Sequence, residues 1–176
     1  MKTLARPHPR FLLAGAAVMI SLGAASYVLL STSGDSDAER NPDPRAAKGA
    51  DPGISFERAA GDLRLHLPAA ITQVRYLARN DSEPYFLRFS FITSCSAVPR
   101  FATDNDLVRG RAEKADVIEL EGLRKTARDL GSPMPEGAAA TVWGDGDENG
   151  LKKRAVANVP VKNQDCQVVG TFEDYS

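Results

Sequence analysis

An unbroken apolar segment near the start of the chain constrains it more than any other feature. Phe11 to Leu30 contains only apolar and small residues and no charge. A helix of this length covers about 30 Å, the thickness of a bilayer's hydrocarbon core, so the segment predicts a single transmembrane helix. Basic residues precede it and acidic residues are the first charges after it. This asymmetry predicts a cytoplasmic N-terminus over residues 1–10 and an extracytoplasmic remainder, tethered to the cell membrane.

The same features also describe a secretory signal peptide, which would be removed from the mature protein. Gly23 and Ala25 are small residues of the kind found at a cleavage site. Tyr27 to Leu30 favours a retained anchor, because a spanning helix needs these apolar residues and a soluble mature chain does not. No cysteine lies near the end of the apolar segment, so a lipid-modified cysteine cannot be the anchor. Both alternatives place the remainder of the chain outside the membrane.

Composition divides the remainder into a linker and one domain. Residues 31–54 are rich in Ser, Gly, Pro, Asp and Ala, which predicts a disordered linker. Residues 55–176 are long enough for one globular domain. The formal net charge of the chain is −1, with acidic and basic residues interspersed, so nucleic acid is not an expected partner.

The chain has two cysteines, Cys95 and Cys166, and both belong to the predicted outer domain. An oxidising compartment allows such a pair to persist as a disulfide. The alternative is a redox-active or metal-binding pair, but the C-x-x-C spacing typical of such sites is absent. We therefore expect a structural disulfide.

Apolar residues alternate with polar ones in several short segments, as in strands with one solvated face. Helical spacing appears after Ser96, which is a candidate helix cap before Pro99, and again in residues 116–130, where Gly131 is a typical C-terminal stop. The predicted strands cover residues 63–67, 73–79, 85–93, 138–143, 151–161 and 165–172. Strands, then helices, then strands indicate an α+β fold: an antiparallel sheet of about five to six strands with one or two helices packed on one face.

The sharpest local motif is the segment from Asp145 to Gly150. Asp145, Asp147 and Asn149 occupy positions one, three and five of an EF-hand-type calcium loop, with glycine at position six. Position twelve, where a bidentate glutamate should complete the ligands, is Val156. A turn between two strands explains the same residues, so we expect no metal or cofactor.

No catalytic motif is evident in the sequence. Of the two histidines, only His66 belongs to the predicted outer domain, which excludes a multi-histidine metal site there. The sequence contains no G-x-S-x-G, no phosphate-binding glycine loop and no H-E-x-x-H. We therefore expect the protein not to be an enzyme.

Several local patterns resemble small, uncharacterised extracytoplasmic membrane proteins or lipoproteins of actinobacteria. The resemblance is carried by Leu67-Pro68-Ala69, Val74-Arg75-Tyr76, Leu87-Arg88-Phe89, the following cysteine and Val98-Pro99-x-Phe101. It implies a surface location and an α+β domain, and it implies no catalytic residue. This chain differs from the lipoproteins because it lacks their modified cysteine.

These observations together predict a binding module of the cell envelope that is not an enzyme. The lipid bilayer would hold its N-terminal helix, and an envelope protein is an expected partner. A sheet face or an exposed edge strand would provide the binding surface. The alternative is a secreted hydrolase or hydrolase inhibitor that is released by cleavage near Ala25 and uses a site near His66.

Overall fold

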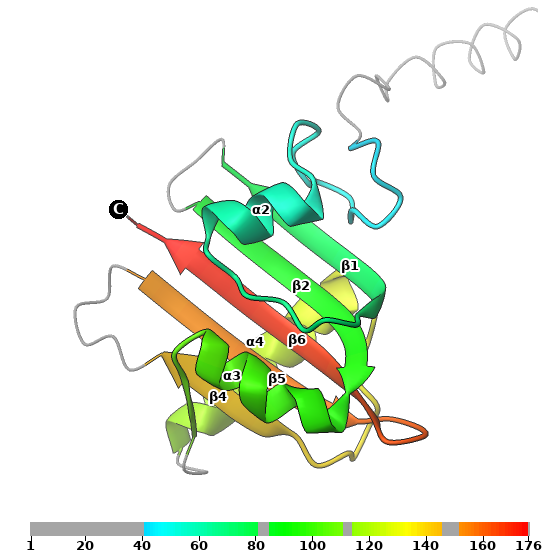
Figure 1. Cartoon of the computed structure of the whole chain (residues 1–176), viewed down its shortest axis with the longest axis vertical. Coiled ribbons are helices and arrows are strands. Elements are labelled where there is room, and N and C mark those ends of the chain that lie inside the picture. Colours follow the sequence, from blue (N-terminus) through cyan, green and yellow to red (C-terminus); the bar gives the residue numbers. More distant parts are fainter. Residues whose placement is uncertain (1–40, 81–84, 111–113, 146–151, 176) are drawn as a thin grey trace, which may run out of the picture. The chain divides into compact units, whose positions relative to one another are not determined.

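A single antiparallel sheet forms the centre of the computed structural model, which describes residues 41–80, 85–110, 114–145 and 152–175 (Figure 1). Its six strands are in the order β1-β2-β6-β5-β4-β3. All neighbouring strands are antiparallel. The predicted α+β class and the number of about five to six strands are confirmed, although the strand at Leu107–Arg109 is not among the predicted ones. The strands are β1 (Thr72–Arg79), β2 (Tyr85–Ser94), β3 (Leu107–Arg109), β4 (Thr141–Asp145), β5 (Lys152–Pro160) and β6 (Asp165–Asp174).

Helices cover both faces of this sheet. Figure 1 shows α2 (Phe56–Asp62) and α3 (Val98–Asp104) in front of the strands and α4 (Lys114–Asp129) behind them. The prediction that helices pack on one face is therefore wrong. The reason lies in the central strands, which are apolar on both faces: Val156 of β5 belongs to the core under α2 and α3, while its neighbour Ala157 packs with Leu123 of α4.

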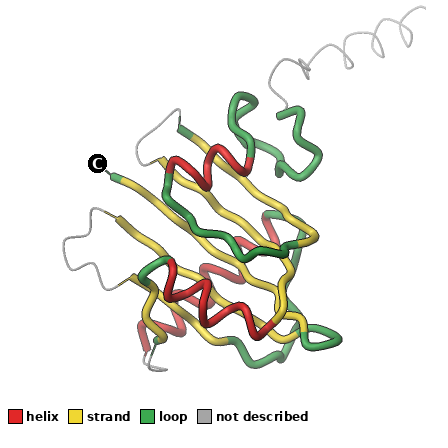
Figure 2. Tube along the Cα trace, in the orientation of Figure 1, coloured by secondary structure: helices red, strands yellow, loops and turns green. Residues whose placement is uncertain are grey.

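The predicted strand over residues 63–67 is also wrong. Ser55 accepts a hydrogen bond from the backbone N–H of Arg58 and begins α2, a helix that is not among the predicted ones. The alternating Leu63 and Leu65 are buried, but Arg64 between them has a φ of +53°, which a regular strand does not allow. Figure 2 shows this segment as part of a long loop that crosses the front of the sheet between α2 and β1.

Residues 41–54 are ordered, so the predicted disordered linker is wrong over this range. Asn41, Ala50 and Ile54 are buried. The Asn41 amide donates hydrogen bonds to the carbonyls of Asp51 and Ile54. Residues 31–40 of the predicted linker, together with the predicted cytoplasmic residues 1–10 and transmembrane segment 11–30, lie outside the described residues. None of the described helices is long and apolar enough to span a membrane. The chain divides into the units Met1–Ala38 and Glu39–Ser176, and all described residues belong to the second.

The two predicted helices are present, although the start of the first differs from the prediction. Ser94, rather than Ser96, caps the short 3-10 helix η2 (Cys95–Ala97) that leads into α3. Pro99 lies in the first turn of α3, as predicted. The predicted stop at Gly131 after α4 is confirmed by its φ of +69°.

Aromatic rings fill the core between the sheet and its front layer. Phe89 and Phe91 of β2 stack at a centroid distance of 5.7 Å, and Phe172 of β6 meets Phe89 edge-on. Phe101 of α3 meets Phe91 edge-on and so joins the helix to the sheet. Because these side chains are almost fully buried, they fix the positions of β2 and β6 at the centre of the sheet.

Candidate functional site

The outer edge of β1 is covered by another segment over only part of its length. Tyr76 donates its N–H to the carbonyl of Arg45 at 3.1 Å and accepts from the N–H of Ala47 at 2.7 Å. Ala78 accepts from the N–H of Asp51 at 2.9 Å. Residues 45–51 therefore satisfy the second half of this edge, where an unpaired strand would otherwise invite pairing with another chain.

Two local features end this cover at Arg45. The backbone N–H of Arg45 donates to the carboxylate of Asp43 at 2.9 Å instead of to the sheet. Pro44 has no N–H to donate. Within the part of the chain that the structure describes, no backbone segment pairs with the outer side of residues 72–75.

A β-bulge lies in this open part of β1. Thr72 pairs with Ile92 and Arg75 pairs with Ser90, so β1 holds one more residue than β2 between these two pairs. Gln73 has a φ of +50°. A bulge interrupts the ladder and increases the local twist. The open part of the edge is thus short and bent, which makes it a poor template for long-range strand pairing.

A pocket of about 660 Å³ lies against this open edge. It combines apolar side chains with the hydroxyl groups of Thr72 and Ser132, the amide of Gln73 and two guanidinium groups. The lining residues come from three separate parts of the chain: Pro44 and Arg45; Ile71, Thr72, Gln73, Val74 and Arg75; and Gly131 and Ser132. Its volume falls within the range of about 300–1,000 Å³ typical of ligand pockets.

The wall formed by Gly131 and Ser132 is held rigidly at the end of α4. Gly131 donates to the carbonyl of Arg128 and Ser132 donates to that of Ala127, which is the hydrogen-bond pattern of a Schellman motif. The amide of Gln167, which is 4% exposed, donates to the Ser132 carbonyl at 2.6 Å and to the hydroxyl groups of Ser132 and Ser90. This wall is therefore tied to both β2 and β6.

Ion pairs of Arg45 hold the pocket wall that Pro44 and Arg45 form. The guanidinium of Arg45 donates to the carboxylates of Asp43 and Glu57. The hydrogen bonds from Arg45 lower the pKa of both carboxyl groups and raise the pKa of Arg45 itself. These three groups therefore stay ionised near neutral pH, and Arg45 has its charge compensated.

Arg75 has a different electrostatic environment from Arg45. Its Nη1 donates to the Pro44 carbonyl at 3.0 Å, and this acceptor is neutral. Among the described residues, no carboxylate lies within ion-pair distance of Arg75. Within the described part of the chain, the pocket therefore presents an exposed guanidinium without a carboxylate partner beside neutral hydrogen-bonding groups, an arrangement that can bind an anion.

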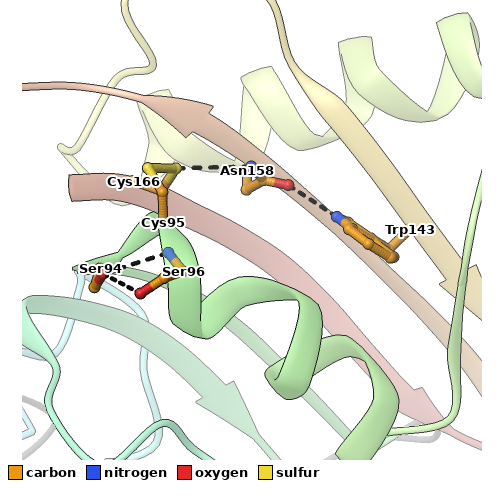
Figure 3. Close-up of a disulfide and its surroundings, with 6 residues drawn as sticks. All are labelled: Ser94, Cys95, Ser96, Trp143, Asn158 and Cys166. Carbon is orange, nitrogen blue, oxygen red and sulfur yellow. Dashed lines mark hydrogen bonds between the residues drawn. A yellow bond between two sulfur atoms is a disulfide. The ribbon is translucent and has the colours of Figure 1, made fainter. Parts of the chain in front are cut away.

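Cys95 and Cys166 form the predicted disulfide. Figure 3 shows it at the start of η2, with Asn158 donating to the sulfur of Cys166 and accepting from the indole N–H of Trp143. The disulfide lies next to Gln167 and Thr93, two residues whose hydrogen bonds help to hold the pocket in place. Cys166 directly precedes Gln167, and Cys95 follows two residues after Thr93, whose hydroxyl donates to the Ala70 carbonyl at 2.8 Å, next to the pocket residue Ile71.

The other candidate residues do not join this pocket. Asp145 ends β4, whereas Asp147 and Asn149 lie outside the described residues, so the calcium-loop motif is not tested as a unit. The described residues contain no cluster of acidic, histidine or cysteine side chains able to hold a metal. His66 is exposed, and its backbone N–H and carbonyl form hydrogen bonds with the side chain of Asn105. These contacts of residue 66 involve its backbone and have a structural role.

Sequence reasoning missed the pocket because its walls are distant along the chain. Residues 44–45, 71–75 and 131–132 meet only when β1 pairs with β2 and α4 packs behind them. One signal was present in the sequence: Asn41-Pro42-Asp43-Pro44 combines residues that initiate turns with prolines, and this combination favours a defined turn over a flexible linker.

Comparison with known proteins found no match: no protein-family model, curated protein or solved structure is significantly similar to this chain. The resemblance to actinobacterial extracytoplasmic proteins therefore stays a proposal.

Proposed function

We propose that this protein is a non-enzymatic binding module of the cell envelope, and that the pocket beside the open end of β1 is its binding site. The main support for this proposal is that buried or charged side chains already hold the walls of the pocket in place. A pre-formed site loses little conformational entropy on binding, which favours affinity.

The envelope location in this proposal rests on the sequence. Phe11 to Leu30 is long and apolar enough to anchor the chain, with the domain on the extracytoplasmic side. The disulfide supports the same compartment, because such bonds persist mainly where the environment is oxidising. An envelope protein is the proposed partner.

The pocket favours binding over catalysis. Its polar groups are hydroxyl, amide and guanidinium groups, and none of its lining residues is a histidine, cysteine or carboxylate that would activate a nucleophile or transfer a proton near neutral pH. Among the described residues, no hydroxyl, thiol or carboxylate side chain hydrogen-bonds to the imidazole of His66. The hydrolase alternative therefore has no structural observation to support it.

Site-specific photocrosslinking in the producing cells tests this proposal. A benzophenone amino acid replaces Thr72, which is exposed and lines the pocket, or Arg109, an exposed residue of β3 at the opposite edge of the sheet. We expect a discrete adduct from position 72 that an excess of unmodified full-length protein suppresses, and no such adduct from position 109. Equal labelling from both positions, or no adduct from position 72, would contradict the proposal.

A further inference from the structure

We propose that the pocket binds an extended peptide segment that carries a carboxylate, with the peptide backbone beside Val74 and the carboxylate on the guanidinium of Arg75. This inference rests on the proposed function and adds the chemical class of the ligand. It has two independent supports, one from the backbone of β1 and one from charge.

The backbone of β1 provides the first support. Tyr76 and Ala78 direct their backbone groups to the outer side, where residues 45–51 bind them. The regular pairing holds from Arg75 onward, where the N–H of Arg75 faces β2, so the carbonyl of Val74 on the same trans peptide bond faces the outer side, and Val74 lines the pocket. An extended segment placed there would continue the row of hydrogen bonds that Arg45 and Ala47 begin, which is the strand-addition mode of peptide recognition.

The covering segment of the chain cannot take this place itself. The N–H of Arg45, which would continue the ladder toward Val74, is bound to Asp43. The preceding Asn41 is buried with its amide on the carbonyls of Asp51 and Ile54, which holds the chain away from this part of the edge. The described residues therefore leave the position beside Val74 open.

Charge provides the second support. Of the two arginines in the pocket, Arg45 binds two carboxylates, whereas Arg75 binds a carbonyl. The planar guanidinium matches the two oxygens of a carboxylate, and its contact with Pro44 already restrains its position. Asp43 and Glu57 are already engaged with Arg45, so among the described residues no carboxylate complements Arg75, and a ligand carboxylate would fill this role.

The geometry also limits the length of the ligand. The open part of β1 spans residues 72–75, or about 13 Å at about 3.3 Å per residue, and the bulge interrupts the ladder there. The site therefore fits a segment of about four residues. The carboxylate belongs either to an Asp or Glu side chain or to a free C-terminus, and these two sources share the same chemistry at Arg75.

Binding of defined tetrapeptide pools to the full-length protein tests the inference. The first pool carries Asp at one position, blocked termini and a random choice of Val, Thr or Ile elsewhere, and the second carries Asn instead. The third is the Asn pool with a free C-terminal carboxylate, and the fourth is the Asp pool with N-methylated backbone amides. Fluorescein labels allow dissociation constants to be measured by polarisation.

We expect the Asp pool to bind about fivefold more tightly than the Asn pool, the difference expected for a solvated ion pair of about 1 kcal/mol. Arg75→Gln should remove this preference, whereas Arg109→Gln, which changes an exposed arginine on the opposite edge strand, should keep it. N-methylation should weaken binding, because it removes the backbone donors. A gain for the free C-terminus that equals or exceeds the gain for Asp would assign the carboxylate to a chain end.

Equal binding of the Asp pool, the Asn pool and the free-C-terminus pool, or a preference for a carboxylate that persists in Arg75→Gln, would overturn the inference. If position 72 still gives its suppressible crosslink in that case, the proposed function stands and only the ligand class is wrong. If the crosslink and the binding of all pools are both absent, the proposed function fails as well.

Discussion

At the scale of single residues, the contact between Gly170 and Phe89 shows how tightly the core is packed. These residues are opposite each other on β6 and β2. A Cβ atom at position 170 would overlap the Phe89 ring, with Cε1 at 2.8 Å and Cε2 at 2.9 Å. The ring cannot move away easily, because Phe91 and Phe172 contact it. Glycine at position 170 is therefore required by the space that Phe89 occupies.

Gly170→Ala should destabilise the protein by about 1–3 kcal/mol, the range typical of overpacking in a rigid core. Urea denaturation measures this change. The matched control is Gly61→Ala in α2, where an added Cβ meets nothing within 4 Å. The control should be neutral or stabilising by up to about 1 kcal/mol, because alanine favours a helix. Equal stability of the two variants would contradict the packing argument.

The buried phenol of Tyr76 makes stability depend on alkaline pH. Burial, together with the negative charge of Asp43, raises the pKa of Tyr76 from its ordinary value of 10.0 to about 12. The folded protein therefore holds this proton more tightly than the unfolded chain. The resulting stabilisation is fully present below about pH 10 and is lost as the pH rises through about 12.

Tyr76→Phe tests this dependence, because phenylalanine has no proton to lose. We expect the free energy of unfolding of the unmodified protein to fall by about 2 kcal/mol more than that of the variant between pH 10 and pH 12. The variant also loses the hydrogen bond to the Ile54 carbonyl, which lowers its stability at every pH below 10. Urea midpoints across this range measure the effect, and parallel curves for the two proteins would contradict it.

At the scale of elements, the disulfide holds the ends of β2 and β6 in register. It joins Cys95, just after β2, to Cys166 of β6, which pairs with Thr93. The neighbouring Gln167 binds the pocket wall at Ser132, and Thr93 binds the carbonyl of Ala70, which precedes the pocket residue Ile71. The crosslink therefore stabilises the site together with the fold.

Replacing both cysteines by serine should destabilise the protein by about 4 kcal/mol in the chain-entropy model, given a sequence separation of 71. Urea denaturation measures this loss. Amide hydrogen exchange should also accelerate in residues 70–75 and 131–132 more than in α2, since the supports of the pocket lie beside the cysteines. Uniform acceleration throughout the domain would show that the disulfide stabilises the fold without a particular effect on the pocket.

At the scale of the whole molecule, the proposed role depends on a tether whose residues lie outside the described part of the chain. A retained anchor and a cleaved signal predict different masses for the mature protein. We expect intact-mass measurement of the membrane fraction to recover a chain that still contains Phe11 to Leu30. A soluble species that begins near Ser26 would instead identify a diffusible secreted protein and would remove the membrane from the proposal.

Local patterns predicted much of the sheet. The hairpin of β1 and β2 and the strands β5 and β6 follow from alternation and turn residues, and α4 follows from its spacing and Gly131. The segment from Leu63 to Leu67 has the same alternation, yet it forms a loop. There the backbone reverses at Arg64, and Asn105 from the end of α3 binds the backbone of His66. A contact across 39 residues overrides the local pattern at this point.

The sequence alone determined the α+β class and the helix stop at Gly131, because hydrophobic periodicity and turn residues act over a few neighbouring positions. It also determined the pairing of the two cysteines, because an oxidising compartment favours a disulfide and the chain has only these two. Only the tertiary structure decided that helices cover both faces, that residues 41–54 protect half of the β1 edge, and that Arg75 lacks a carboxylate partner among the described residues. These features depend on which distant segments meet when the sheet closes. The candidate site belongs to the second group, since its walls have no relation to one another until the chain is folded.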